Sequence, residues 1–209
     1  MTGQNEEWPN TGSHVERLTL FSDAIFAFAM TLLAVNIRVP EIAQDLLSSQ
    51  LSVELANLLP KFIGYGLSFL ISASYWVFYH RIFAHIKRYD LALIWLNIVF
   101  LFFVVLIPFP SDLIGRFVQQ QVSVVVYSAM MAATGFALSL IWLYASGHHR
   151  LVDESLSSAA INRLSVRTLT MPCVFVVSIP ASFVLGQFTP VLWVSVVVVA
   201  RVINRYYRG

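Results

Sequence analysis

Long apolar runs constrain this chain more than any other feature, because little polar sequence is left between them. A helix needs about 20 mostly apolar residues to cross the hydrocarbon core of a bilayer. Six such runs are present, at about residues 15–39, 59–80, 91–107, 122–145, 169–185 and 191–203. Only 11% of the 209 residues are charged, whereas soluble proteins carry roughly 25% charged residues. The sequence therefore predicts an integral membrane protein with six membrane-spanning segments.

These segments are predicted to be helices rather than strands. Backbone polar groups find no partner in lipid, so only helices and closed barrels cross a membrane. The valine-rich start of the fourth run and the whole of the sixth would suit strands by propensity, but their length and apolar surroundings favour helices. The sequence shows no internal duplication. The predicted fold class is an all-α integral membrane protein, with residues 1–209 forming a single domain of six transmembrane helices.

The distribution of basic residues predicts the orientation of the chain. Connections on the cytoplasmic side of membrane proteins are enriched in Lys and Arg. With six spans, one side holds both termini and the connections after the second and fourth spans. That side carries ten of the 13 basic residues: Arg17, Arg81, Lys87, Arg88, Arg150, Arg163, Arg167, Arg201, Arg205 and Arg208. Only Arg38, Lys61 and Arg116 fall on the other side, so both termini are predicted to lie in the cytoplasm.

Two polar residues inside the first apolar run indicate a site. Ser22 and Asp23 end the sequence Arg17-Leu-Thr-Leu-Phe21-Ser22-Asp23, at the head of that run. Ionisable groups are costly inside a bilayer, so they usually mark a functional site or a buried polar network. We therefore expect Asp23 to have a function or an essential structural role.

Helical geometry separates this polar pair from an apolar stripe on the same helix. The stripe consists of Phe28, Thr31 and Val35, with Ala24 and Leu32 beside it. At 100° per residue its three members fall at about 0°, 300° and 340°, on one face of the helix. Ser22 and Asp23 fall at about 120° and 220°. If the stripe lines an axis, the polar pair points into neighbouring helices.

Polar residues of the second and third spans lie at a depth compatible with Asp23. Ser68, Ser72, Trp76 and His80 recur every four residues, which predicts one stripe on the second span. Asn97 lies seven residues into the third span, as Asp23 does in the first, and seven residues rise about 10 Å in a helix. We expect a buried hydrogen-bond network that joins the first span to the next two through Asp23, Trp76, His80 and Asn97.

Other functional classes lack their residue patterns. Ser22, Asp23 and His80 contain the residue types of a hydrolase triad, but the chain has no Gly-x-Ser-x-Gly elbow to present the serine. It also has no His-Glu-x-x-His motif, a single cysteine and no glycine-rich phosphate loop. We therefore expect no enzyme, no cofactor and no metal beyond a permeant ion. A formal net charge of +2 is too small to suggest a nucleic-acid partner.

The motif in the first span identifies a family by resemblance. Arg17-x-x-x-Phe21-Ser22-Asp23, followed by Ala-Ile-Phe-Ala-Phe-Ala-Met-Thr-Leu-Leu, resembles the first helix of the transmembrane protein 175 family. The resemblance extends to Tyr75-Trp76-x-x-x-His80, to Asn97 and to Pro108-Phe109, and so covers the first half of the chain closely. Members are potassium-permeable channels of animal lysosomes and of prokaryotes. A chain with one six-helix repeat resembles the prokaryotic form, which implies a homotetramer in the bacterial inner membrane.

This resemblance implies a pore lined by four copies of the first helix. Carried over by position, the narrowest layer falls on Phe28, a polar layer on Thr31 and a second apolar layer on Val35. The family usually has Ile or Leu where this chain has Phe28, so a bulkier side chain stands at the constriction. The family motif maps onto Arg17, Phe21, Ser22 and Asp23, and it braces the helix through Trp76, His80 and Asn97.

The implied function is a channel with a weak preference for potassium over sodium. An apolar ring excludes water when it is narrow and conducts when it widens. The hydroxyl groups of Thr31 would replace part of a hydration shell, which potassium sheds more readily than sodium. Glu41 and Asp45 are expected near the outer mouth, where they would concentrate cations. The expected partners are potassium ions, the lipid bilayer and further copies of the chain.

Two other functional classes stay open at this point. A secondary transporter would use Asp23 as a proton or sodium site at the junction of the first three helices. A non-conducting assembly or partner protein would show no flux at all.

Overall fold

The structure is a computed structural model that describes residues 11–35, 37, 39 and 47–194. Its elements, in chain order, are α1 (Thr11–Val35), α2 (Leu47–Asn57), α3 (Leu59–Phe83), α4 (Leu91–Leu106), α5 (Pro108–Phe117), α6 (Gln121–Ser146), η2 (Gly147–His149), α7 (Ser158–Leu185) and η3 (Gly186–Phe188). The two η elements are single turns of 3-10 helix. The predicted all-α fold class is confirmed.

Five helical segments in the described part of the chain are long and apolar enough to cross a membrane. They are His14–Val35, Gln50–Phe83, Leu91–Phe117, Gln121–His149 and Ser158–Phe188. The sixth predicted span, residues 191–203, lies outside the described residues from position 195 onward. The sixth span therefore stays a prediction.

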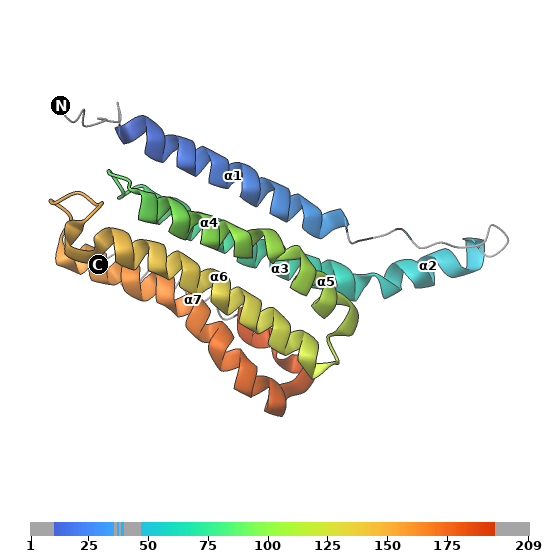
Figure 1. Ribbon diagram of the computed structural model, residues 1–209. Coiled ribbons are helices and arrows are strands. Elements are labelled where there is room, and N and C mark those ends of the chain that lie inside the picture. The colour runs from blue at the N-terminus through green and yellow to red at the C-terminus, as the bar shows by residue number, and fades with distance from the viewer. Residues whose placement is uncertain (1–10, 36, 38, 40–46, 195–209) are drawn as a thin grey trace, which may run out of the picture.

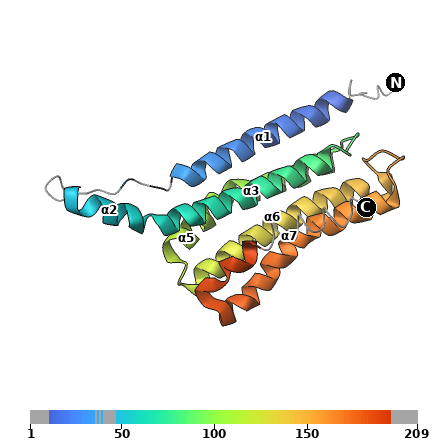
Figure 2. The ribbon, with the colours of Figure 1, turned by 180° about the vertical axis from the view of Figure 1, so that it is seen from behind.

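The helices are arranged in three layers. α1 runs along one side of the bundle, α3 and α4 lie in the middle, and α6 and α7 form the other side (Figures 1 and 2). Within the chain, α1 contacts α3, α4 and α5, whereas α6 contacts α4, α5 and α7. α2 extends beyond the bundle from the start of α3 (Figure 1). α1 is therefore an edge helix that packs against the bundle on one side only.

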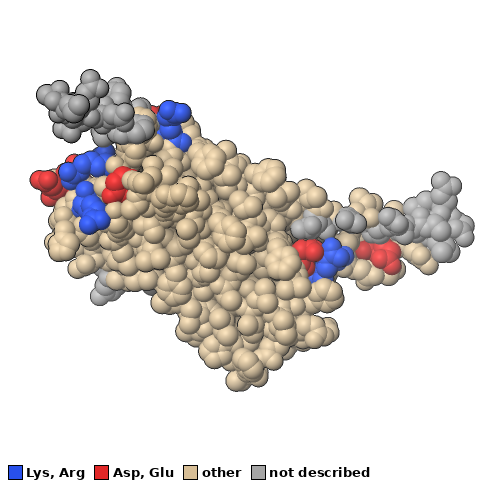
Figure 3. Space-filling view, in the orientation of Figure 1, with Lys and Arg blue, Asp and Glu red and all other residues tan. Residues whose placement is uncertain are grey.

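On the face seen in Figure 3, the charged side chains of the described residues lie at the two ends of the bundle. Between them, the face seen in Figure 3 carries a broad surface without Lys, Arg, Asp or Glu. Charged groups are costly in hydrocarbon and favourable at the membrane–water boundary. This surface fits the apolar core of a bilayer, and the two charged ends fit its headgroup regions.

Two helices differ clearly in extent from the predicted spans. α1 ends at Val35 rather than at residue 39, and the amide of Ile37 donates to the Ala34 carbonyl oxygen at 3.0 Å in a tightened last turn. Pro40 disfavours helical backbone just before it, although the apolar pattern continues to that residue. α7 begins at Ser158 rather than at residue 169. Its first turns are polar, so hydropathy misses them, but Ser157 Oγ caps the helix by accepting from the Ala160 amide at 3.2 Å.

Two short helices differ from the sequence-based expectation. α2 lies in the polar connector between the first two predicted spans, where no membrane-spanning segment was predicted. α5 starts at Pro108, where the third span was expected to stop. Proline needs no backbone donor in the first turn of a helix, so Pro108 ends α4 and begins α5 at once. The third span and α5 together form the segment Leu91–Phe117.

Candidate functional site

The buried face of α1 is narrow and continuous. Ser22, Phe26, Ala29 and Leu33 are each at most 4% exposed, and α1 packs here against α3 and α4. At 100° per residue these four positions fall within about 60° of one another. The buried face of α1 from Ser22 to Leu33 is therefore formed by three apolar residues and one serine.

The opposite face of α1 carries the predicted stripe and is exposed within the single chain. Phe28 is 57% exposed and Val35 is 68% exposed; Ala24 and Thr31 are also exposed, whereas Leu32 is half-buried. The Thr31 hydroxyl donates to the Phe28 carbonyl oxygen at 2.8 Å. Because its proton is used in this way, the hydroxyl oxygen keeps its acceptor capacity for a ligand on this face.

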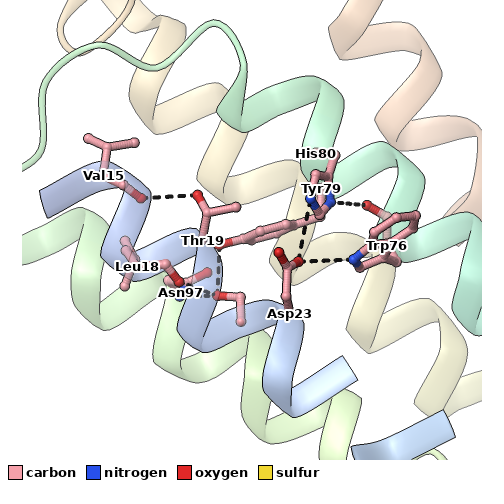
Figure 4. A network of polar contacts seen from close by, with 9 residues as sticks. Val15, Leu18, Thr19, Asp23, Trp76, Tyr79, His80 and Asn97 are labelled. Atoms are coloured by element: carbon pink, nitrogen blue, oxygen red, sulfur yellow. Dashed lines mark hydrogen bonds and ion pairs between the residues drawn. The ribbon is translucent and has the colours of Figure 1, made fainter. Parts of the chain in front are cut away.

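Ser22 joins three helices through one buried hydroxyl group. The hydroxyl groups of Ser22 and Tyr79 lie 2.7 Å apart, with Tyr79 donating, and Asn97 Nδ2 donates to the same Ser22 oxygen at 3.1 Å (Figure 4). The Ser22 proton goes to the Leu18 carbonyl oxygen at 2.9 Å. Ser22, Tyr79 and Asn97 are each 0% exposed. A hydroxyl offers one donor and two acceptor positions, so Ser22 is fully used as the link between α1, α3 and α4.

Asp23 makes the second link between α1 and α3. Trp76 Nε1 donates to Asp23 Oδ1 at 3.0 Å, and His80 Nε2 lies 3.4 Å from the same oxygen (Figure 4). His80 Nδ1 lies 3.2 Å from the Trp76 carbonyl oxygen. Carbonyl and carboxylate oxygens both accept, so both ring contacts are hydrogen bonds only when His80 carries two protons. The side chains of Asp23 and His80 are 33% and 37% exposed.

The structure brings together Ser22, Asp23, Trp76, His80 and Asn97, but their pairing differs from the expectation. Asn97 bonds Ser22 rather than Asp23, and Asp23 is partly exposed rather than buried. Asn97 lies at the predicted depth in the membrane, but depth alone does not say which residue of α1 its side chain faces. Ser22 is the residue of the pair that faces α4.

Arg17 and Phe21 lie outside this network. Both are exposed, and neither forms a hydrogen bond or ion pair among the residues that the structure describes. At 100° per residue they fall at about 340° and 20°, on the same side of α1 as Phe28. Their helix positions turn them away from α3 and α4, so within one chain they do not brace α1.

Sequence reasoning missed Tyr79, which donates to Ser22 and stacks on Phe100 with ring centroids 5.6 Å apart. The missed signal was the spacing of Ser68, Ser72, Tyr75, Tyr79 and Ile82, all buried, which alternates three and four residues. A strict four-residue spacing drifts by about 40° per step around a helix. The predicted stripe from Ser68 to His80 is therefore wrong as one face, because it begins buried and ends partly exposed.

Replacing Ser22 with Ala is expected to lower the free energy of unfolding by about 1–2 kcal/mol. Tyr79 and Asn97 would each keep a buried donor without its acceptor, and interhelical hydrogen bonds in membranes are each worth about 0.6 kcal/mol on average. Thermal unfolding in detergent measures the change. Ser74→Ala is the matched control, because within the described part of the chain the Ser74 hydroxyl bonds only the Leu70 carbonyl oxygen of its own helix, at 2.8 Å. Equal stability of the two variants would contradict the role of Ser22.

The site offers neither a metal centre nor a hydrolase relay among the described residues. No group of three or more His, Cys, Asp and Glu side chains is placed to hold a metal ion there. Ser22 bonds Tyr79 and Asn97 rather than His80, so a Ser–His–Asp relay does not form. Glu41 and Asp45, predicted near the outer mouth, lie outside the described residues.

Comparison with known proteins shows which family the chain resembles. The family profile described as endosomal/lysosomal potassium channel TMEM175 matches residues 17–108, which hold the whole polar network. A potassium channel of Streptomyces collinus is 30% identical over 155 residues, covering 72% of this chain and 74% of that protein. The chain belongs to the TMEM175 family. A potassium channel of Chamaesiphon minutus is 28% identical over 175 residues, covering 82% of this chain and 86% of that protein.

The fold agrees with a solved TMEM175 structure. The crystal structure of a lysosomal potassium-selective channel TMEM175 homologue from Chamaesiphon minutus matches with a TM-score of 0.79 and 26% identity. The match covers 92% of this chain and 99% of that chain. The chain is therefore an integral membrane protein of an ion-channel family, and membership supports a potassium channel.

Proposed function

We propose that the chain forms a homotetrameric, weakly potassium-selective channel in the inner membrane of a bacterium, with both termini in the cytoplasm. Four copies of α1 line the pore, and Phe28 forms its constriction. The observation that carries this proposal is the exposed face of α1, which lies opposite the face packed on α3 and α4. In the proposed tetramer this face lines a central pore, whereas the motif residues Ser22 and Asp23 bind α1 to the helices on its other side.

Conduction then depends on two layers of the stripe. A ring of Phe28 side chains excludes water when narrow, and a small outward movement of α1 admits a hydrated column. One turn further, Thr31 oxygens keep free lone pairs because their protons bond the Phe28 carbonyl oxygens. They can replace part of the hydration shell of a passing ion. No closed cage of ligands forms in this way, so the preference for potassium over sodium is weak.

The test is ion flux from liposomes that contain the purified protein. Potassium-loaded and sodium-loaded liposomes are compared in parallel, and single-channel currents are recorded in planar bilayers. Stepwise currents with a larger potassium conductance support the proposal. Absence of flux from well-folded protein in both assays would contradict it and favour the non-conducting class.

A secondary transporter is the alternative that one observation favours. Asp23 and His80 form a titratable pair that is about one-third exposed, and such a pair inside a membrane protein is a typical proton or cation site. A transporter of this kind would show saturating, proton-coupled flux rather than stepwise currents.

Replacing Asp23 with Asn separates the two functions. Asn keeps an oxygen that accepts from Trp76 Nε1 but cannot carry a negative charge. For a channel we expect potassium flux within about threefold of wild type, a change of less than ~1 kcal/mol in the barrier. Asp23→Ala, which removes the acceptor as well, is expected to impair assembly or gating. Collapse of proton-coupled flux in Asp23→Asn alone would favour the transporter, and wild-type behaviour of Asp23→Ala would contradict the bracing role of Asp23.

A further inference from the structure

A hollow beside the end of α1 brings charged residues next to the exposed stripe. Its volume is about 350 Å³, and Leu32 and Val35 of α1 line one side. The other side is formed by α5, where Asp112 and Arg116 stand among apolar side chains. Figure 3 shows acidic and basic surface at this end of the bundle, next to the apolar belt. The last turn of the stripe therefore lines the same hollow as an ion pair.

The ion pair is a local one on α5. Arg116 Nε donates to Asp112 Oδ1 at 2.9 Å and lies 2.8 Å from Oδ2. The Asp112 and Arg116 side chains are 31% and 48% exposed. Pairs at this spacing and exposure stabilise a helix by only about 0.3–0.5 kcal/mol. The pair therefore contributes little to folding, and its charges remain available to act on ions.

Asp112 is the negative member of a set in which positive charge prevails. A second, smaller hollow behind the pair is lined by Asp112, Arg116 and also Lys61 of α3. Among the described residues that line either hollow, Asp112 is the one carboxylate, and the basic residues are Arg116 and Lys61. Losing Asp112 would make the region more positive, and losing Arg116 would bring it closer to neutral.

We propose that Asp112 and Arg116 act in opposite directions on the cation conductance of the pore, through the electrostatic potential where the α1 stripe ends. The inference rests on the proposed function and adds to it two residues that tune the conductance. An ion that passes Val35 moves along the surface of α1 that the hollow shares. A unit charge about 10 Å away in a medium of mixed dielectric changes the local cation concentration about twofold or more. Asp112 raises that concentration, and Arg116 offsets the increase.

The test is a charge series measured by single-channel potassium conductance at two salt concentrations. Arg116→Gln is expected to raise the conductance about twofold at low ionic strength, and Asp112→Asn is expected to lower it about twofold. At about 1 M salt, where the Debye length is about 3 Å, both differences should vanish. The double variant Asp112→Asn with Arg116→Gln keeps the net charge and is expected to conduct like wild type.

The other end of the bundle offers a matched control. Arg88 and Glu154 form an exposed ion pair with 4.0 Å between Arg88 Nη2 and Glu154 Oε1, and the hollow that both line includes no described residue of α1. Arg88→Gln and Glu154→Gln should therefore leave the low-salt conductance unchanged.

Three results would overturn the proposal. Changes of the same sign in Asp112→Asn and Arg116→Gln, or a double variant that departs most from wild type, would show a structural role. Unchanged conductance in both variants would also overturn it, while the wild-type current still supported the channel. A wild-type protein without current would overturn both.

Discussion

Replacing Phe28 with Ala is expected to raise potassium flux about tenfold and to weaken the discrimination between potassium and sodium. A tenfold rise corresponds to a barrier lower by ~1.4 kcal/mol. In the proposed tetramer, four Phe28 rings meet at the axis and exclude water. Four methyl groups leave a wider passage that stays hydrated, so ions cross the layer with more of their hydration shell. A hydrated ion touches the wall less, and the weak selectivity of the stripe falls accordingly.

The measurement is flux from potassium-loaded and sodium-loaded liposomes, with the same amount of protein inserted in each. Phe102→Ala is the matched control, because Phe102 of α4 is 60% exposed and Phe28 is 57% exposed. Each variant removes one exposed phenyl ring, but only Phe28 lies on the α1 stripe. Equal flux in wild type and Phe28→Ala would remove Phe28 from the constriction. A similar rise in Phe102→Ala would assign the effect to leak through a loosened bundle.

The sequence predicted the two faces of α1 because both follow from the 100° rotation per residue. The stripe of Phe28, Thr31 and Val35 is exposed, and the helix is held from the other side through Ser22. Phe21 belongs to the exposed face, although its motif suggested the network. The motif alone does not say which face of the helix each of its residues occupies, whereas the rotation of 100° per residue assigns each position to a face.

The rest of the site could not be predicted from one sequence, for identifiable physical reasons. Tyr79 looks like one more aromatic residue in an apolar span, and only its position relative to Ser22 shows that it donates a buried hydrogen bond. Runs of apolar residues give the spans but not their ends, since α7 begins in polar turns and Pro108 starts a helix as well as ending one. The Asp112–Arg116 pair acquires its place beside Val35 only through the packing of α5 against α1.

The close packing of α6 against α7 predicts a large loss of stability for a substitution at Gly135. Gly135 of α6 faces Pro172 of α7, and a methyl group added at Gly135 would lie 2.8 Å from Pro172 Cδ and 3.0 Å from its Cβ. The proline ring is rigid and buried, so it cannot turn aside as a flexible side chain would. Close helix pairs in membranes depend on such small residues, because no hydrophobic effect drives helices together in lipid.

Gly135→Ala is therefore expected to lower the free energy of unfolding by about 2 kcal/mol, within the range of overpacked cores. The change is opposite to the intrinsic preference of a helix, where Ala is favoured over Gly by about 1 kcal/mol. Gly66→Ala in α3 is the matched control, because a methyl group there meets no atom within 4 Å. It should leave the protein as stable as wild type or slightly more stable.

Thermal unfolding of both variants, followed by intrinsic fluorescence in detergent, compares them directly. The fluorescence of Trp142 and Trp193 reports on this region, because both rings are buried and Trp193 stacks on Tyr127 of α6 with centroids 4.4 Å apart. If Gly135→Ala is as stable as Gly66→Ala, α7 can shift away from α6 without cost, and the close approach at Pro172 does not fix the pair. A selective loss in Gly135→Ala would instead show that α6 and α7 form a tightly packed unit. Such a unit would provide the rigid support against which the middle helices, and through them α1, are held.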